Sequence, residues 1–368
     1  MTTKFAEAAL GVKYRHHRDP EHKEEISGGA MYYLRDGFAN RNIPYVGPIF
    51  AAIFCVCCVG AAFGAGNMFQ ANQAFQQLLN VTGGEASYFA DKGWLFGVIL
   101  AVMVGAVIIG GLKSIAAAAS KIVPIMGGIY LLGGIAVIMF NITSLPSALW
   151  TIIEMAFTAE AGFGAVLGGM LIGVQRAVFS NEAGIGSASI VHATAKTDQP
   201  VSQGFVGMLG PFVDTILICM VTALVIVITG SYEIGNGMEG VELTSRAFES
   251  VIPWFPYVLA LIVFLFAYST MIAWSYYGLK GVTYILGEKT SVELLYKIIF
   301  CLVTIVGASA AFDNIILFTD SMIFAMAIPN VIGLYLLAPE LKKDLKKYLQ
   351  DIEKKDGNSV GKNVSMTV

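Results

Sequence analysis

The chain has 368 residues, of which 56% are hydrophobic and 13% are charged, and its mean hydropathy is +0.69. Soluble domains carry about 25% charged residues, so this composition excludes an ordinary water-soluble protein and predicts a membrane protein surrounded by lipid. The net charge of −3 provides no broad basic surface, and nucleic acid is therefore excluded as an expected partner.

The predicted elements are helices that span a membrane. A spanning helix needs about 20 mostly apolar residues. The eight stretches that qualify lie near 47–80, 93–112, 119–141, 162–196, 203–229, 252–279, 294–311 and 313–338. We therefore expect one transmembrane domain at 47–338, a preceding segment at 1–46 and a basic tail at 339–368.

The amino-terminal segment resembles the inner end of a helix. Phe5, Ala8, Ala9 and Val12 recur at helical spacing in Thr3–Arg15, which predicts a spanning helix whose upstream part is absent. The segment lacks the features of a signal peptide.

Lysine and arginine are concentrated in the amino-terminal segment, alternate connections and the tail. The connections on the other side hold only Lys92 and Arg246. Because cytoplasmic loops carry the excess of these residues, we expect both ends of the chain to be cytoplasmic.

A first polar cluster is Gly66-Asn-Met-Phe-Gln-Ala-Asn72, inside the first apolar stretch. Asn67 and Gln70 are three residues apart and share a helix face, so their amides can hydrogen-bond a polar solute. The alternative for the glycines is close helix packing.

The most informative cluster is Val178-Phe-Ser-Asn-Glu-Ala-Gly-Ile-Gly-Ser187, in the fourth stretch. Gly184 and Gly186 weaken a helix, and its polar side chains are costly against lipid. We expect a helix broken near 179–187 that offers carbonyls to a cation and a half-helix amino terminus to an anionic group. Polar contacts between helices are the alternative.

A third cluster is Phe266-Ala-Tyr-Ser-Thr-Met-Ile-Ala-Trp-Ser-Tyr-Tyr-Gly278. Ser269 and Thr270 can offer hydroxyl oxygens to a hard cation, and Thr270 shares a helix face with Trp274. The alternative is that these hydroxyls bond back to their own helix.

The remaining polar residues carry less information. Asp214, Asp320 and Glu182 are intramembrane acids, and Glu182 is a cation ligand, a proton site or a partner of Arg176. His192 is expected to be a structural hydrogen bonder. Cys55, Cys57 and Cys58 are expected to be small packing residues, and a soft-metal site is the less favoured alternative.

No Walker loop, dinucleotide fingerprint or His-Glu-x-x-His motif occurs. The chain is therefore not expected to be an enzyme or to carry a cofactor, and transport would be coupled to an ion gradient.

These residues resemble the alanine or glycine:cation symporters, also called the sodium:alanine symporter family. The resemblance covers nearly the whole chain. It is carried by Thr3–Arg15, Gly66–Asn72, Lys121-Ile-Val-Pro124, Phe179-Ser-Asn-Glu-Ala-Gly-Ile-Gly186, and Phe266-Ala-Tyr-Ser-Thr270 with Trp274.

The resemblance implies symport of alanine or glycine with sodium or protons, and a leucine-transporter-like bundle of inverted repeats in the inner membrane of a bacterium. It implies pocket positions for Gln70, Phe179, Ser180, Asn181, Thr270 and Trp274, and cation positions for Ser269 and Thr270.

Family members carry further helices ahead of the segment that matches Thr3–Arg15, including a broken first core helix. We therefore expect a bundle that lacks its first helices, with a separately encoded amino-terminal segment as an expected partner. One competing interpretation is a non-transporting truncated remnant or scaffold. A channel is less favoured, because a single broken helix does not indicate a ring-shaped selectivity filter.

Overall fold

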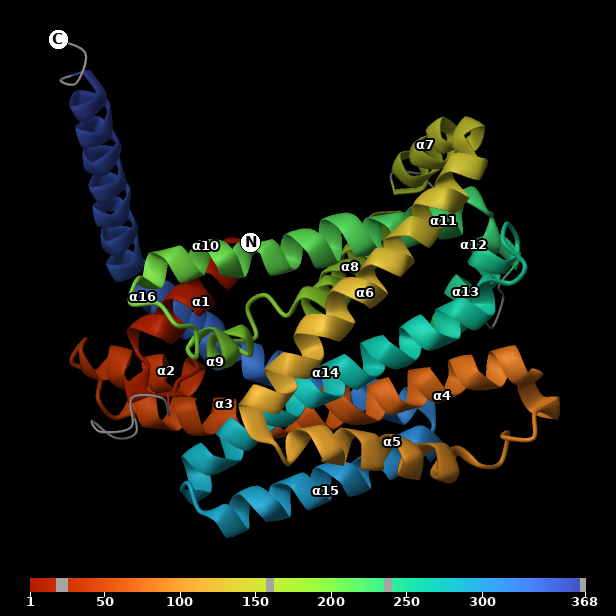
Figure 1. Ribbon diagram of the computed structural model, residues 1–368, viewed down its shortest axis with the longest axis horizontal. Coiled ribbons are helices and arrows are strands. Elements are labelled where there is room, and N and C mark those ends of the chain that lie inside the picture. Colours follow the sequence, from red (N-terminus) through yellow and green to blue (C-terminus); the bar gives the residue numbers. More distant parts are fainter. Residues whose placement is uncertain (18–25, 157–161, 235–239, 365–368) are drawn as a thin grey trace. The chain divides into compact units, whose positions relative to one another are not determined.

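The computed structural model describes residues 1–17, 26–156, 162–234 and 240–364. Parts of the predicted amino-terminal segment, at 18–25, and of the tail, at 365–368, lie outside the described residues. The described residues are mostly helical (Figure 1) and include two short strands, in which His16 pairs with Ser27 and His17 with Ile26 in antiparallel register. The predicted all-α polytopic class is confirmed.

Six helices within the described residues are long and apolar enough to cross a membrane. Their bounds are Val46–Thr82, Gly111–Phe140, Pro200–Ile228, Phe255–Leu286, Thr290–Ser309 and Phe312–Lys354. The stretch expected near 93–112 forms a shorter apolar helix, Gly93–Ile108. The stretch expected at 162–196 is divided, because helix α8 ends at Asn181 and helix α9 begins at Ala188.

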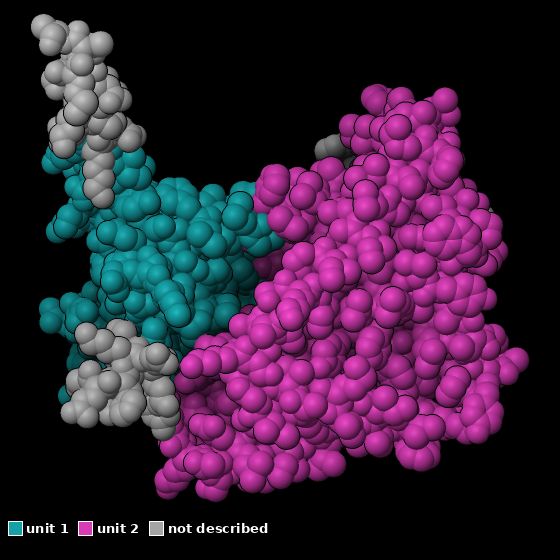
Figure 2. Space-filling view, viewed as in Figure 1, with its two compact units in different colours: residues 1–54, 182–210, 326–368 teal, residues 55–181, 211–325 magenta. Residues whose placement is uncertain are grey.

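The chain forms two compact units (Figure 2). Unit 1 comprises residues 1–54, 182–210 and 326–368, and unit 2 comprises residues 55–181 and 211–325. The division falls at the end of α8, so Asn181 belongs to unit 2 and Glu182 to unit 1.

Unit 1 packs short helices around the segment that follows the break. Its elements are α1 (Thr2–Lys13), β1 (His16–His17), β2 (Ile26–Ser27), α2 (Ala30–Ala39), α9 (Ala188–His192), the first part of α3 (Val46–Phe63), nearly all of α10 (Pro200–Pro211) and the last part of α16 (Phe312–Val364). Phe5 and Ala9 of α1 pack with Val201 of α10 and Leu341 of α16. A side chain at Gly11 would lie 2.6 Å from the carbonyl oxygen of Ser189, so α1 and α9 approach each other backbone to backbone.

Unit 2 holds the longer apolar helices and two π-helical segments. The π-helical segments are η1 (Gly64–Met68) and η5 (Phe212–Cys219). The described part of unit 2 also contains the last part of α3, the first part of α16, α4 (Phe69–Thr82), η2 (Gly84–Ala86), α5 (Gly93–Ile108), α6 (Gly111–Phe140), η3 (Ile142–Ser144), α7 (Leu145–Ala156), α8 (Gly162–Asn181), α11 (Met220–Ile228), α12 (Ser231–Ile234), α13 (Val241–Glu249), α14 (Phe255–Leu286) and α15 (Thr290–Ser309). Helix α15 packs along α5, and α14 packs against α4 and α6 (Figure 1).

The core of unit 2 is aromatic where α6, α13 and α14 meet. The ring of Phe248 stacks on that of Phe255 with centroids 4.5 Å apart, and the ring of Tyr130 lies 5.7 Å from that of Phe248. Phe248 is fully buried. This stack joins the short helix α13 to two long helices.

Replacing Phe248 by alanine is expected to lower the free energy of unfolding by about 3–5 kcal/mol, because the truncated ring leaves a cavity. The melting temperature of the purified protein in detergent checks this. Leu132→Ala, at a side chain that is 70% exposed, is the control and should change the melting temperature little. Equal melting temperatures for Phe248→Ala and the wild type would contradict the packing described.

Candidate functional site

The end of helix α8 carries Ser180 and Asn181, and both side chains are bound by η5. The Ser180 hydroxyl donates to Oδ2 of Asp214 at 2.8 Å, and Nδ2 of Asn181 donates to Oγ1 of Thr215 at 3.1 Å. Thr215 in turn donates to Asp214 at 3.1 Å. Single-turn π-bulges occur frequently at functional sites. Asp214, which the sequence singled out only weakly, thus organises two predicted site residues.

Asn67 lies in the other π-helical segment and is completely buried. Its Nδ2 donates to the carbonyl oxygen of Phe300 at 2.7 Å, while its Oδ1 is buried without a hydrogen-bond partner in the described part of the chain. Gln70 donates from Nε2 to the carbonyl oxygen of Ala65 at 3.1 Å. The side-chain amides of Asn67 and Gln70, which were predicted to face one solute, therefore donate hydrogen bonds to backbone carbonyl groups.

Helix α14 carries the third predicted cluster. The Ser269 hydroxyl donates to the carbonyl oxygen of Phe266 at 3.0 Å, which is the back-bonded arrangement of the alternative interpretation. Thr270 is half-buried, and Trp274 is 3% exposed. A cation site at Ser269 and Thr270 stays a prediction.

Two close contacts join those parts of the three predicted clusters that lie in unit 2. A side chain at Gly66 would lie 2.2 Å from Cβ of Trp274, so η1 and α14 pack directly at this glycine. The ring of Phe69 meets that of Phe179 edge-on, with centroids 5.0 Å apart. Segments at 66–70, 179–181 and 274, far apart in the sequence, are therefore neighbours. Phe69, which the sequence analysis did not select, forms the link to the end of α8.

Two of the intramembrane charges form an ion pair within unit 2. Arg176 forms an ion pair with Asp320, and its guanidinium carbon lies 5.4 Å from the ring centre of Phe179. Glu182, considered as a partner of Arg176, accepts a hydrogen bond from Ser187. His192 is hydrogen-bonded to Gln203 at 2.7 Å, in line with a structural role.

The cysteines are free thiols in the structure, and Sγ of Cys58 lies 3.7 Å from the carbonyl oxygen of Tyr277. The described residues contain no group of histidine, cysteine and acidic side chains suited to a metal ion. The soft-metal alternative thus gains no support.

The backbone of the break is bound by a side chain that the sequence analysis missed. Oε1 of Glu7, on α1, accepts hydrogen bonds from the amides of Gly184 at 2.8 Å and Gly186 at 3.0 Å. A side chain of the same unit therefore binds the amides of the two glycines that precede α9. A single carboxylate in the apolar Phe5–Val12 helix was the available signal.

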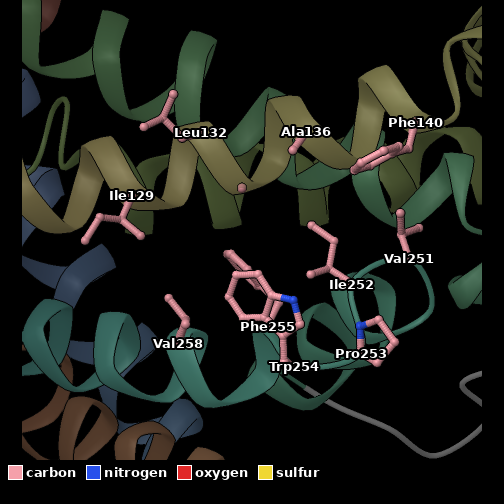
Figure 3. Close-up of a pocket in the computed structure, with 11 residues that line it drawn as sticks. Ile129, Leu132, Ala136, Phe140, Val251, Ile252, Pro253, Trp254, Phe255 and Val258 are labelled. Atoms are coloured by element: carbon pink, nitrogen blue, oxygen red, sulfur yellow. The ribbon is translucent and has the colours of Figure 1, made fainter.

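A pocket of about 690 Å³ lies between α6 and the start of α14 (Figure 3). Its walls are apolar, with Leu132, Phe140 and Trp254 largely exposed. None of the predicted site residues lines it. The indole N–H of Trp254 is the one polar side-chain group in this lining, and no charged side chain is present to bind a zwitterion, so the pocket is unsuited to an amino acid.

Apolar spanning helices, a helix broken within a polar run and aromatic contacts beside it define an integral membrane protein of the transporter class. The profile of the sodium:alanine symporter family matches residues 1–362. The chain belongs to this family. It is accordingly a transporter, and not an enzyme.

Individual relatives agree with this assignment. The sodium/alanine symporter AgcS of Methanococcus maripaludis is 40% identical over 95% of this chain and 74% of its own length. The amino-acid carrier protein AlsT of Bacillus subtilis is 33% identical over 95% of this chain and 70% of its own length. The Bacillus subtilis protein named "Probable sodium/glutamine symporter GlnT" is 32% identical over 90% of this chain and 66% of its own length.

Gly66→Ala is expected to destabilise the protein by about 1–3 kcal/mol, because the added methyl group overpacks against Trp274. Gly128→Ala is the matched control, since a side chain at Gly128 meets nothing within 4 Å. The melting temperature in detergent distinguishes the two variants. If both melt at the wild-type temperature, η1 and α14 are not packed as described.

Proposed function

We propose that this protein carries out secondary active symport of a small neutral amino acid, alanine or glycine, with sodium or protons. Membership of the sodium:alanine symporter family supports this, as does its 40% identity to a protein named as a sodium/alanine symporter. The structural observation that carries the proposal is a pair of contacts within unit 2, between Gly66 and Trp274 and between Phe69 and Phe179, that join parts of the three predicted clusters. The remnant or scaffold alternative is not favoured, because the match to a transporter family extends over residues 1–362.

In this proposal the polar and aromatic residues have different tasks. Side-chain amides and a hydroxyl orient the solute, and two rings limit its size. The proposed substrate residues are Asn67, Gln70, Phe179, Ser180, Asn181, Thr270 and Trp274, with Gly184 and Gly186 forming the broken backbone. The support is that Asp214 and Thr215 hold Ser180 and Asn181, while Phe69 contacts Phe179.

The coupling ion is cargo and not a resident cofactor. We propose Ser269 and Thr270 as its ligands, since hydroxyl oxygens suit a hard cation. The back-bonded Ser269 hydroxyl keeps its oxygen lone pairs able to bind an ion, because donation to Phe266 uses only its proton.

We place the protein in the inner membrane of a bacterium as a multi-pass protein with both ends cytoplasmic. The distribution of lysine and arginine supports this orientation. The chain spans 74% of the length of AgcS. A separately encoded amino-terminal segment is a proposed partner, alongside the surrounding lipid.

Uptake of radiolabelled alanine into vesicles is expected to require external sodium, and Thr270→Ala should raise the sodium concentration for half-maximal uptake. The reason is that the variant removes one ion ligand while leaving most of α14 unchanged. The measurement is initial uptake against sodium concentration, with choline as the replacing cation and the proton gradient collapsed. Equal uptake in choline would refute sodium coupling. An unchanged dependence of uptake on sodium concentration in Thr270→Ala would show that Thr270 has only a packing role.

The solute cavity is expected to admit glycine and alanine and to reject leucine. One methylene changes packing selectivity by about 1–3 kcal/mol, so glycine and alanine should differ modestly and leucine should be excluded strongly. Competition against labelled alanine by glycine, glutamine, valine and leucine measures this, and Trp274→Ala should relax the exclusion. Leucine competing as well as glycine in the wild type would contradict a small cavity. Strong competition by glutamine would indicate the selectivity that the name of GlnT describes.

A further inference from the structure

Glu7 is an acidic side chain in an apolar helix, and it is completely buried. Within the described residues, its hydrogen bonds fall on one oxygen, Oε1. Besides the amides of Gly184 and Gly186, Oε1 accepts a hydrogen bond from Nδ2 of Asn330 at 2.9 Å. Glu7 therefore joins α1 to the segment after the break and to α16, within unit 1.

Asn330 completes the attachment of the break. Its Nδ2 also donates to the carbonyl oxygen of Gly184 at 2.8 Å, and its Oδ1 accepts a hydrogen bond from Tyr33. Both groups of the Gly184 peptide backbone are thus held by buried side chains from other helices. Tyr33 and Asn330 are themselves fully buried, which fixes the direction of the amide.

The backbone that Glu7 holds has a conformation that requires such support. Glu182, Gly184 and Gly186 have φ values of +54°, +96° and +90°. This region is unfavourable for a non-glycine residue, and here it covers the residue directly after Asn181. A side chain at Gly186 would lie 2.6 Å from the ring of Phe54, so the loop has little space in which to relax.

Lys4 is the charged residue nearest to Glu7 along α1, and the two side chains attract each other electrostatically. Lys4 lies one helical turn before Glu7, and its Nζ lies 3.4 Å from the carbonyl oxygen of Glu182. Oε2 of Glu7 is buried and has no hydrogen-bond partner in the part of the chain that the structure describes. An unsatisfied buried oxygen costs stability, so packing alone does not explain a carboxylate at this position.

We propose that Glu7 is the positioning residue that sets the shape of the broken helix for substrate binding. This inference rests on the proposed symport. Because Gly184 and Gly186 give their amides to Glu7, the solute carboxylate is received elsewhere, and these residues contribute shape to the site. Glu7 acts on the solute through the backbone that leads from Glu182 back to Asn181 and Ser180, the residues proposed to orient it.

The test compares Glu7→Ala and Glu7→Gln with Glu340→Gln in vesicles that contain the full chain. Glu340 is the matched control, because it is also a unit 1 acid that contacts α1, accepting from Lys13 and Tyr14 away from the break. Losing hydrogen bonds to a charged group should raise the KM for alanine about tenfold or more in Glu7→Ala. Glu7→Gln retains an acceptor oxygen and should recover most of the affinity.

Two further readouts separate positioning from general destabilisation. The sodium concentration for half-maximal uptake should change less than the KM for alanine, because the proposed cation ligands lie on α14. Amide hydrogen exchange in the peptide that contains Gly184 and Gly186 should accelerate in Glu7→Ala, while peptides from α14 keep wild-type exchange. Glu340→Gln should leave all three readouts unchanged.

Unchanged alanine KM and exchange in Glu7→Ala would overturn the proposal while leaving symport intact. Equal changes in the KM for alanine and in the sodium concentration for half-maximal uptake would show that Glu7 only stabilises the fold. Faster amide hydrogen exchange throughout the chain would lead to the same conclusion. A wild type that takes up no alanine under any cation would instead refute the proposed function, and the exchange measurement would still report whether Glu7 anchors the loop.

Discussion

A helix that stops within an apolar segment exposes amide and carbonyl groups with which lipid cannot form hydrogen bonds. Each of these groups costs on the order of 2–7 kcal/mol when it is left unpaired. Here the break between Asn181 and Ala188 is held by Glu7 and Asn330, whose hydrogen bonds of 2.8–3.0 Å reach both backbone groups of Gly184. The positive φ values of the loop depend on these side chains. Unit 1 can therefore be understood as the support of a locally unwound backbone.

Unit 2 presents the side chains proposed to meet the solute. Its organisation depends on the absence of a side chain at Gly66, which lets Trp274 pack against η1, and on the contact between Phe69 and Phe179. The two π-helical segments both lie beside proposed site residues, with Asn67 in η1 and Asp214 in η5. Local departures from α-helical geometry thus accompany the polar groups in an otherwise apolar bundle.

The helical class and the position of the interruption could be predicted from the sequence, because hydropathy and the run of Glu182, Gly184 and Gly186 are local properties. The side chains that bind the interrupted backbone could not be predicted from the sequence. Glu7 and Gly184 are 177 residues apart and Glu7 and Asn330 are 323 apart, and no local pattern records such a contact. The ion pair between Arg176 and Asp320 could not be predicted either, because these residues are 144 apart in the sequence. The direction of the Ser269 hydroxyl depends on competition between its own helix and other oxygens, which spacing does not resolve.

The proposed symport requires that a small amino acid and a cation bind this protein with mutual dependence. Thermodynamic linkage requires that if sodium raises the affinity for alanine by some factor, alanine raises the affinity for sodium by the same factor. Calorimetric titration of the purified protein in both orders measures the two factors directly. Symport predicts that the two factors are equal and greater than one. Alanine binding with the same affinity in sodium and in choline would contradict it.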